Sequence, residues 1–298
     1  MGKKYILTDD TYVIGDHMLH RIQAVKSFGD VKKGDLGGFI ECENNLSHSG
    51  DCWLYDNAYV YGDANVSGNA TIHDYGVVCD NASVSGNARI RGNALIHERA
   101  HICDASVVIG YSNVSGNSHI KGSSILSGYC DVRDSDIDGI AHICYTSKVI
   151  NSSIKGFFKI NNNAIIDYAH LYGSGDFGRD TYITNEKDFI TIRGLYSSRD
   201  SVTFYKTKSE DIYVSYAGFC DSIYEFEKMV KKSIVAKNKK EYMKSIELVK
   251  MHFKKWKKKS TFLEEKELIS KEIDYVYNTS IGNVFNYILY LYDVIYYF

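Results

Sequence analysis

The sequence contains no proline and no Cys-x-x-Cys pair, although it has 25 tyrosines and seven cysteines. The missing proline, with many Ile, Asn and Lys residues, is typical of AT-rich coding sequences and excludes no function. Because paired cysteines are absent, a structural zinc site is not expected, and we predict no bound metal. An odd number of scattered cysteines without a disulfide framework indicates a reducing compartment.

An excess of charge of one sign and a long hydrophobic run are also missing. The formal net charge is -2, which gives no general attraction to nucleic acid or anionic membranes. The start, "MGKKYILTDDTY", lacks the apolar core of a signal peptide. The end, "VFNYILYLYDVIYYF" (284–298), contains Asp293 and is short for a bilayer span, so we expect a buried or oligomer-forming helix. The basic run "FKKWKKKS" (253–260) is typical of a solvated helix end, and we predict no membrane partner and no sequence-specific nucleic-acid partner.

What the sequence does contain is a six-residue repeat. An aliphatic residue recurs at every sixth position without a miss, and a small residue precedes each by two positions from Ala58 onward. The aliphatic residues are Leu54, Val60, Val66, Ile72, Val78, Val84, Ile90, Ile96, Ile102, Val108, Val114, Ile120, Leu126 and Val132. The interval breaks after Val132, resumes at Ile143 and breaks again before Ile154. A period of six fits neither a helix nor an ordinary strand, and it indicates a repeat architecture.

Six residues accommodate one short strand and one tight turn. Three such units make a triangular coil of 18 residues, and successive coils stack at about the 4.8 Å strand spacing. We therefore predict a mainly β chain with a parallel β-helix of roughly six to seven coils over residues 51–178. Residues 1–50 form a small N-terminal β cap, in which "TYVIGDHMLHRIQA" contributes two strands with a turn at Gly15-Asp16. Residues 179–298 form an α+β domain with a helix over about 222–258.

Residues that flank the aliphatic positions point outward, because side chains alternate along a strand. One face carries Tyr59, Tyr61, Val77, Cys79 and Leu95, and we expect another domain or subunit to cover it. A second face is mixed, with Arg89 and Arg91 followed by Val107, Ile109 and Ile125. The third face is polar, and His101 and His119, which are 18 residues apart, should stack on it one coil apart.

A resemblance to a known class rests on the segment "KYILTDDT" and on "LHRIQAVKSFGDVKKGDLGGFIECENNLSHSGDCWLYDNAYVYGDA". This part of the chain, residues 3–66, resembles hexapeptide-repeat proteins of bacteria, phages and prophages, which are usually labelled as transferases. The resemblance implies a left-handed β-helix. Residues 188–220 and the following helix resemble a domain appended to many phage-encoded proteins, with counterparts at 195–199, 203–205, 218–220 and 224–226. At these positions Tyr196 replaces a glycine of the phage pattern, and residues 217–220 change its usual order.

Many hexapeptide-repeat proteins are acyltransferases, and the resemblance implies a histidine general base at a subunit boundary and a coenzyme A donor along the coils. His101 and His119 are the best candidates for that role. The alternative is that they are surface histidines on a polar face. The repeat from 54 to 132 lacks the long inserted loop that closes many active sites of this class, which argues against the transferase.

A second candidate site lies in "RGLYSSRDSVTFYK", where cationic, hydroxyl and aromatic side chains suit a nucleotide-like anion. The ligand-binding residues would be Arg193, Ser197, Ser198, Arg199, Thr203, Tyr205 and Lys206. We therefore favour a non-catalytic phage protein that sequesters a small anionic, nucleotide-like ligand. A bacterial immune signalling nucleotide would be such a ligand. Such a protein would need no cofactor, would act in the cytoplasm of an infected or lysogenic host, and would form a homotrimer or another homo-oligomer. The alternatives are an acetyl-coenzyme A-dependent acyltransferase and a structural or host-protein-binding platform.

Overall fold

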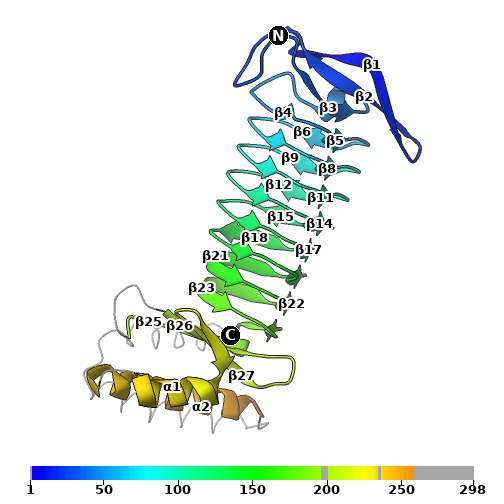
Figure 1. Ribbon diagram of the computed structural model, residues 1–298. Helices are drawn as coiled ribbons and strands as arrows, with labels where there is room; N and C mark the ends of the chain where they lie inside the picture. Colours follow the sequence, from blue (N-terminus) through cyan, green and yellow to red (C-terminus); the bar gives the residue numbers. More distant parts are fainter. Residues whose placement is uncertain (1, 196–200, 234–235, 258–298) are drawn as a thin grey trace, which may run out of the picture. The chain divides into compact units, whose positions relative to one another are not determined.

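The computed structural model describes residues 2–195, 201–233 and 236–257 (Figure 1). The chain divides into two compact units, Met1–Glu186 and Lys187–Phe298, and each is described by itself. The division therefore falls eight residues after position 178, and the N-terminal cap lies in the same unit as the solenoid.

The first unit is a parallel β-solenoid of about nine turns, and the predicted fold class is confirmed. Each coil contributes one short strand to each of three faces (Figure 1). The first face consists of β5 (Tyr59–Val60), β8 (Val77–Val78), β11 (Leu95–Ile96), β14 (Asn113–Ser115), β17 (Asp131–Arg133), β20 (Lys148–Ile150), β22 (Ile165–Asp167) and β24 (Tyr182–Ile183). The second consists of β4 (Trp53–Leu54), β7 (Thr71–Ile72), β10 (Arg89–Ile90), β13 (Val107–Val108), β16 (Ile125–Leu126), β19 (His142–Ile143) and the end of β21 (Ser153–Ile160).

The third face, here called the polar face, carries the candidate histidines. It consists of β6 (Asn65–Val66), β9 (Ser83–Val84), β12 (His101–Ile102), β15 (His119–Ile120), β18 (Asp136–Gly139), the start of β21, and the start of β23 (His170–Phe177). Partners in neighbouring coils are 18 residues apart from Ser83 to His119, and the interval falls to 17 between His119 and Asp136. This is the point at which the sequence repeat shifts by one residue.

The interior follows from the repeat. Every aliphatic residue of the predicted series has no exposed surface, and the small residues two positions earlier are buried beside the corners. From Ser106 to Ser124 these small residues are serines instead of alanines. The hydroxyls of Ser112, Ser118 and Ser124 each donate to the carbonyl three residues earlier, at 2.7–2.9 Å, which satisfies the buried polar group.

The N-terminal cap continues the first face. Strands β1 (Tyr5–Ile14) and β2 (His17–Ala24) form the predicted hairpin, with Gly15 at φ +56° in its turn. Strand β3 (Leu36–Ile40) is antiparallel to β2 but parallel to β5, and a 3-10 turn follows at Glu43–Asn45. The expected six to seven coils were too few, because parallel pairing begins at β3 and continues to β24.

The second unit is a four-stranded antiparallel sheet with two helices. Its strands are β25 (Phe189–Arg193), β26 (Ser201–Lys206), β27 (Ile212–Tyr216) and β28 (Phe219–Ser222), in that order; a 3-10 turn at Glu186–Asp188 precedes them. Helices α1 (Ile223–Ser233) and α2 (Ala236–Lys257) replace the single helix expected from the sequence. One straight helix would separate Phe226 and Tyr242 by about 24 Å. Their ring centroids are instead 6.2 Å apart, in a core shared with Val202, Phe204 and Val214.

No helix among the described residues is long and apolar enough to cross a membrane. The apolar segment 284–298 lies outside those residues, as does the end of the basic run at 258–260.

Candidate functional site

The centre of the polar face brings the two predicted histidines together. His101 on β12 and His119 on β15 are register partners, and their ring centroids are 5.8 Å apart in an edge-on arrangement. One coil earlier, Ser83 on β9 is paired with His101, and its Oγ lies 2.5 Å from His101 Nδ1. The solenoid therefore aligns a hydroxyl and two imidazoles along its axis, on backbone that is hydrogen-bonded on both sides.

His101 is electrostatically suited to accept a proton. Burial lowers its pKa from the ordinary value of 6.5, and the nearby His119 lowers it further, while Asp104 opposes both. The imidazole is therefore neutral at pH 7. In the tautomer with the proton on Nδ1, the ring donates to Ser83, and Nε2 keeps its lone pair. Within the described part of the chain, Nε2 has no hydrogen-bond partner.

A charged group lies on the next coils of the same face. Lys121 Nζ is 3.4 Å from Asp136 and 3.7 Å from Asp138, and Lys155 Nζ is 3.8 Å from Asp136. Asp136 raises the pKa of Lys121, so this ammonium is firmly charged. Because both lysines already face carboxylates, an anionic substrate must compete with Asp136 and Asp138 for them.

Cys103, beside His101 in sequence, is poorly suited to nucleophilic chemistry. Burial raises the pKa of its thiol, and Asp104 adds to the effect, although Lys121 opposes it. The protonated thiol is a weak nucleophile, so the imidazole is the stronger candidate on this face. No group of three metal-binding side chains occurs among the described residues.

The second predicted site lies on β25 and β26, and much of it is enclosed. Thr203 and Tyr205 are almost fully buried, with hydrogen bonds to Thr191 Oγ1 at 3.1 Å and Cys220 Sγ at 3.3 Å. Lys206 forms an ion pair of 2.6 Å with the buried Asp188, whereas Arg193 is exposed. Ser197, Ser198 and Arg199 lie outside the described residues. Ligand contact at Thr203 or Tyr205 would therefore require neighbouring segments to move.

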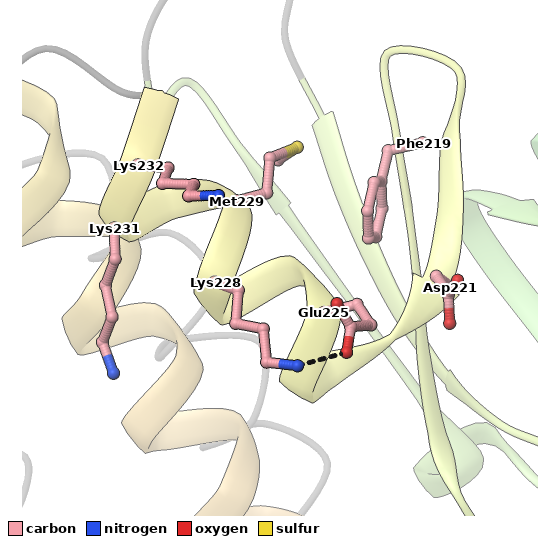
Figure 2. A pocket seen from close by; sticks show the side chains of 7 residues that line it. All are labelled: Phe219, Asp221, Glu225, Lys228, Met229, Lys231 and Lys232. Atoms are coloured by element: carbon pink, nitrogen blue, oxygen red, sulfur yellow. Dashed lines mark hydrogen bonds and ion pairs between the residues drawn. The ribbon is translucent and has the colours of Figure 1, made fainter.

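A shallow hollow of about 650 Å³ was not anticipated from the sequence (Figure 2). It lies between β28 and α1 and is lined by Phe219, Asp221, Glu225, Lys228, Met229, Lys231 and Lys232. Two of its lysines are already paired with acids, Lys228 with Glu225 and Lys231 with Glu227, each at 2.6 Å. The helical spacing of Glu225 and Lys228 predicts that pair, but the hollow depends on how α1 packs beside β28, which local spacing does not determine.

Comparison with known proteins finds a short similarity to one acetyltransferase and establishes no family. No protein-family model matches the chain. Over 56 residues the chain is 45% identical to the uncharacterized acetyltransferase YdcK of Escherichia coli K12. That stretch covers 18% of this chain and 17% of the length of YdcK. The fold is that of the left-handed β-helix class, and the similarity connects a short part of it to an acetyltransferase.

Proposed function

We propose that this protein is an acyltransferase of the hexapeptide-repeat class that uses His101 as a general base. The observation that carries the proposal is the half-buried imidazole, which is kept neutral by its surroundings and bound at Nδ1 to Ser83. The similarity to an acetyltransferase supports the same class of reaction. Nucleotide sequestration has less support, because Thr203 and Tyr205 of its candidate site are buried.

In the proposed reaction, His101 Nε2 accepts a proton from an acceptor hydroxyl or amine. The acceptor oxygen or nitrogen attacks the acyl carbonyl of a thioester, the carbon–sulfur bond breaks, and the thiolate leaves with the proton from His101. Ser83 stabilises the imidazolium, because its hydroxyl oxygen accepts a hydrogen bond from the protonated Nδ1 of His101. Acetyl-coenzyme A is the donor that the class implies, and no resident cofactor is needed.

A homotrimer is part of the proposal. In this class the histidine lies at a subunit boundary, and a neighbouring subunit can supply the cover that an inserted loop gives elsewhere. This matters here because residues 54–132 form uninterrupted coils. Sedimentation of the full chain should give a trimer, whereas a monodisperse monomer would contradict this part of the account.

The direct test is calorimetric titration of acetyl-coenzyme A into the full-length protein, followed by assay of free thiol release with a panel of amino and hydroxyl acceptors. We expect saturable binding by the wild type and by His101→Gln, with acceptor-dependent release only by the wild type. Ser85→Ala is the matched control, since Ser85 follows β9 and its side chain forms no hydrogen bond with a histidine among the described residues. Absence of acetyl-coenzyme A binding would overturn the proposal.

Sequestration of a nucleotide-like anion stays the second candidate, because uninterrupted coils suit a non-catalytic scaffold and Arg193 is exposed. Thermal unfolding in the presence of cyclic dinucleotides and ADP-ribose derivatives distinguishes it. Stabilisation by a nucleotide, lost in Arg199→Ala and kept in His101→Gln, would favour sequestration in an infected host. No shift with any small molecule would favour the protein-binding platform.

A further inference from the structure

A buried lysine and a buried cysteine touch where the cap meets the first coil. Lys4, just before β1, and Cys52, just before β4, are 1% and 0% exposed. Lys4 Nζ lies 3.2 Å from Cys52 Sγ, 2.8 Å from the Cys52 carbonyl oxygen and 3.3 Å from the Gly50 carbonyl oxygen. The ring of Phe28 covers the remaining side, with its centroid 4.9 Å from Nζ.

This lysine has no acidic partner. Within the part of the chain that the structure describes, Lys4 forms no ion pair with an aspartate or glutamate. A buried ammonium is normally paired, because removal of a charge from water is costly. Around Lys4, carbonyl oxygens, an aromatic ring face and a sulfur atom stand where an acidic partner would be expected. Sulfur is the oxidisable member of the set, and the amine is fixed against it.

The environment of Cys52 favours a reaction with the Lys4 amine over disulfide exchange with another thiol. Three carbonyl oxygens, of Ser47, Ser49 and Val66, surround Sγ at 3.4–3.7 Å. Burial raises the pKa of the thiol, which Lys4 partly opposes. Disulfide exchange needs a thiolate that a second sulfur can reach. A fully buried sulfur lacks that access but has a nitrogen in contact.

We propose that Lys4 and Cys52 form an oxidative cross-link in which one oxygen atom bridges Nζ and Sγ. Dioxygen is the oxidant: the thiol loses its hydrogen, the lysine ammonium releases one proton to water and the resulting amine loses one hydrogen, and S–O and O–N bonds form. Sulfur and nitrogen each give up two electrons, dioxygen accepts all four, and its second oxygen leaves as water. One inserted oxygen spans most of the 3.2 Å between Nζ and Sγ. A direct S–N bond would require the two atoms to move much closer together within a packed interior.

The cross-link would fasten the beginning of the cap hairpin to the first coil. Lys4 and Cys52 are 48 residues apart in sequence, so a bond between them closes a long loop and restricts the unfolded chain. Because added thiols reduce such a bond, the stability of the cap would depend on redox conditions.

The test is peptide mass spectrometry of the full-length protein after incubation in air or under argon, without reductant. We expect a linked pair of peptides containing Lys4 and Cys52. Its mass should equal the sum of the two peptide masses plus one oxygen atom and minus two hydrogen atoms. The pair should be absent under argon, after dithiothreitol, and in Lys4→Arg and Cys52→Ser. Cys130 is the internal control: it is 1% exposed, and its Sγ contacts Ser112 Oγ at 3.1 Å instead of a lysine. It should stay unlinked.

Air oxidation should also raise the midpoint of thermal unfolding of the wild type, reversibly with dithiothreitol, and leave Lys4→Arg unchanged. Recovery of Lys4 and Cys52 as separate peptides after prolonged aeration would overturn the proposal. So would oxidation of Cys52 to its sulfinic acid with Lys4 unmodified.

Discussion

Ser83 Oγ lies 2.5 Å from His101 Nδ1, across two adjacent coils of the solenoid. The contact follows from the parallel register, which places residues 18 positions apart side by side. A hydrogen bond at Nδ1 selects the ring tautomer and holds the imidazole in one orientation. The repeat thus positions a candidate base without any loop.

Replacement of His101 should abolish transfer without loss of the fold. In the presence of an accepted substrate, we expect His101→Gln to lower kcat/KM by about 10²–10⁴-fold, the usual contribution of a general base. Ser83→Ala should have a smaller effect, because it removes the orienting contact and keeps the base. Steady-state kinetics of both variants beside Ser85→Ala tests this, and equal activity of His101→Gln and wild type would remove His101 from the mechanism.

The pH dependence should reflect the lowered pKa of His101. Because burial disfavours the charged imidazole, the activity profile should rise with pH, and the midpoint of that rise should lie below 6.5. The free energy of unfolding should change with pH in the same direction as the activity. The unfolded chain binds the proton at higher pH than the folded chain, so stability is lost as pH falls below about 6.5. Urea unfolding of wild type and His101→Gln should show a smaller pH dependence in the variant; an identical dependence would contradict the assignment.

The interior and exterior positions of one strand should respond very differently to truncation. Ile90 has no exposed surface, and Ile90→Ala should cost about 2–5 kcal/mol, from lost burial and the cavity left behind. Its neighbour Arg89 is exposed, and Arg89→Ala should change stability by less than about 0.5 kcal/mol. Denaturant unfolding of the two variants measures the contrast, and similar costs would contradict the alternation along β10.

Two glycines with positive φ should differ in their tolerance of alanine. Gly15 at φ +56° has open space around it, so Gly15→Ala should cost about 1–2 kcal/mol for the left-handed backbone alone. Gly86 at φ +67° would place its Cβ 2.8 Å from the backbone nitrogen of Asp104 in the next coil. Gly86→Ala should therefore unfold at a clearly lower temperature than Gly15→Ala, and the reverse order would contradict the stacking of the corners.

The solenoid could be predicted from the sequence because each six-residue repeat corresponds to one strand and one turn. Burial at Ile96 and Ile102, and the pairing of His101 with His119, follow from counting residues. The two-helix arrangement of the second unit was not predictable in this way, because packing of Phe226 against Tyr242 depends on tertiary contacts rather than local period. The contact of Lys4 with Cys52 joins the non-repetitive cap to the first coil, and no spacing in the sequence indicates it. Burial of Tyr205 was missed because a strand pattern does not show which face is covered.

The measurement that tests the central claim most directly is titration of acetyl-coenzyme A with parallel detection of free thiol. The account predicts saturable binding by wild type and His101→Gln, and acceptor-dependent thiol release that only the wild type supports. Absence of acetyl-coenzyme A binding, combined with thermal stabilisation by a cyclic dinucleotide, would contradict it.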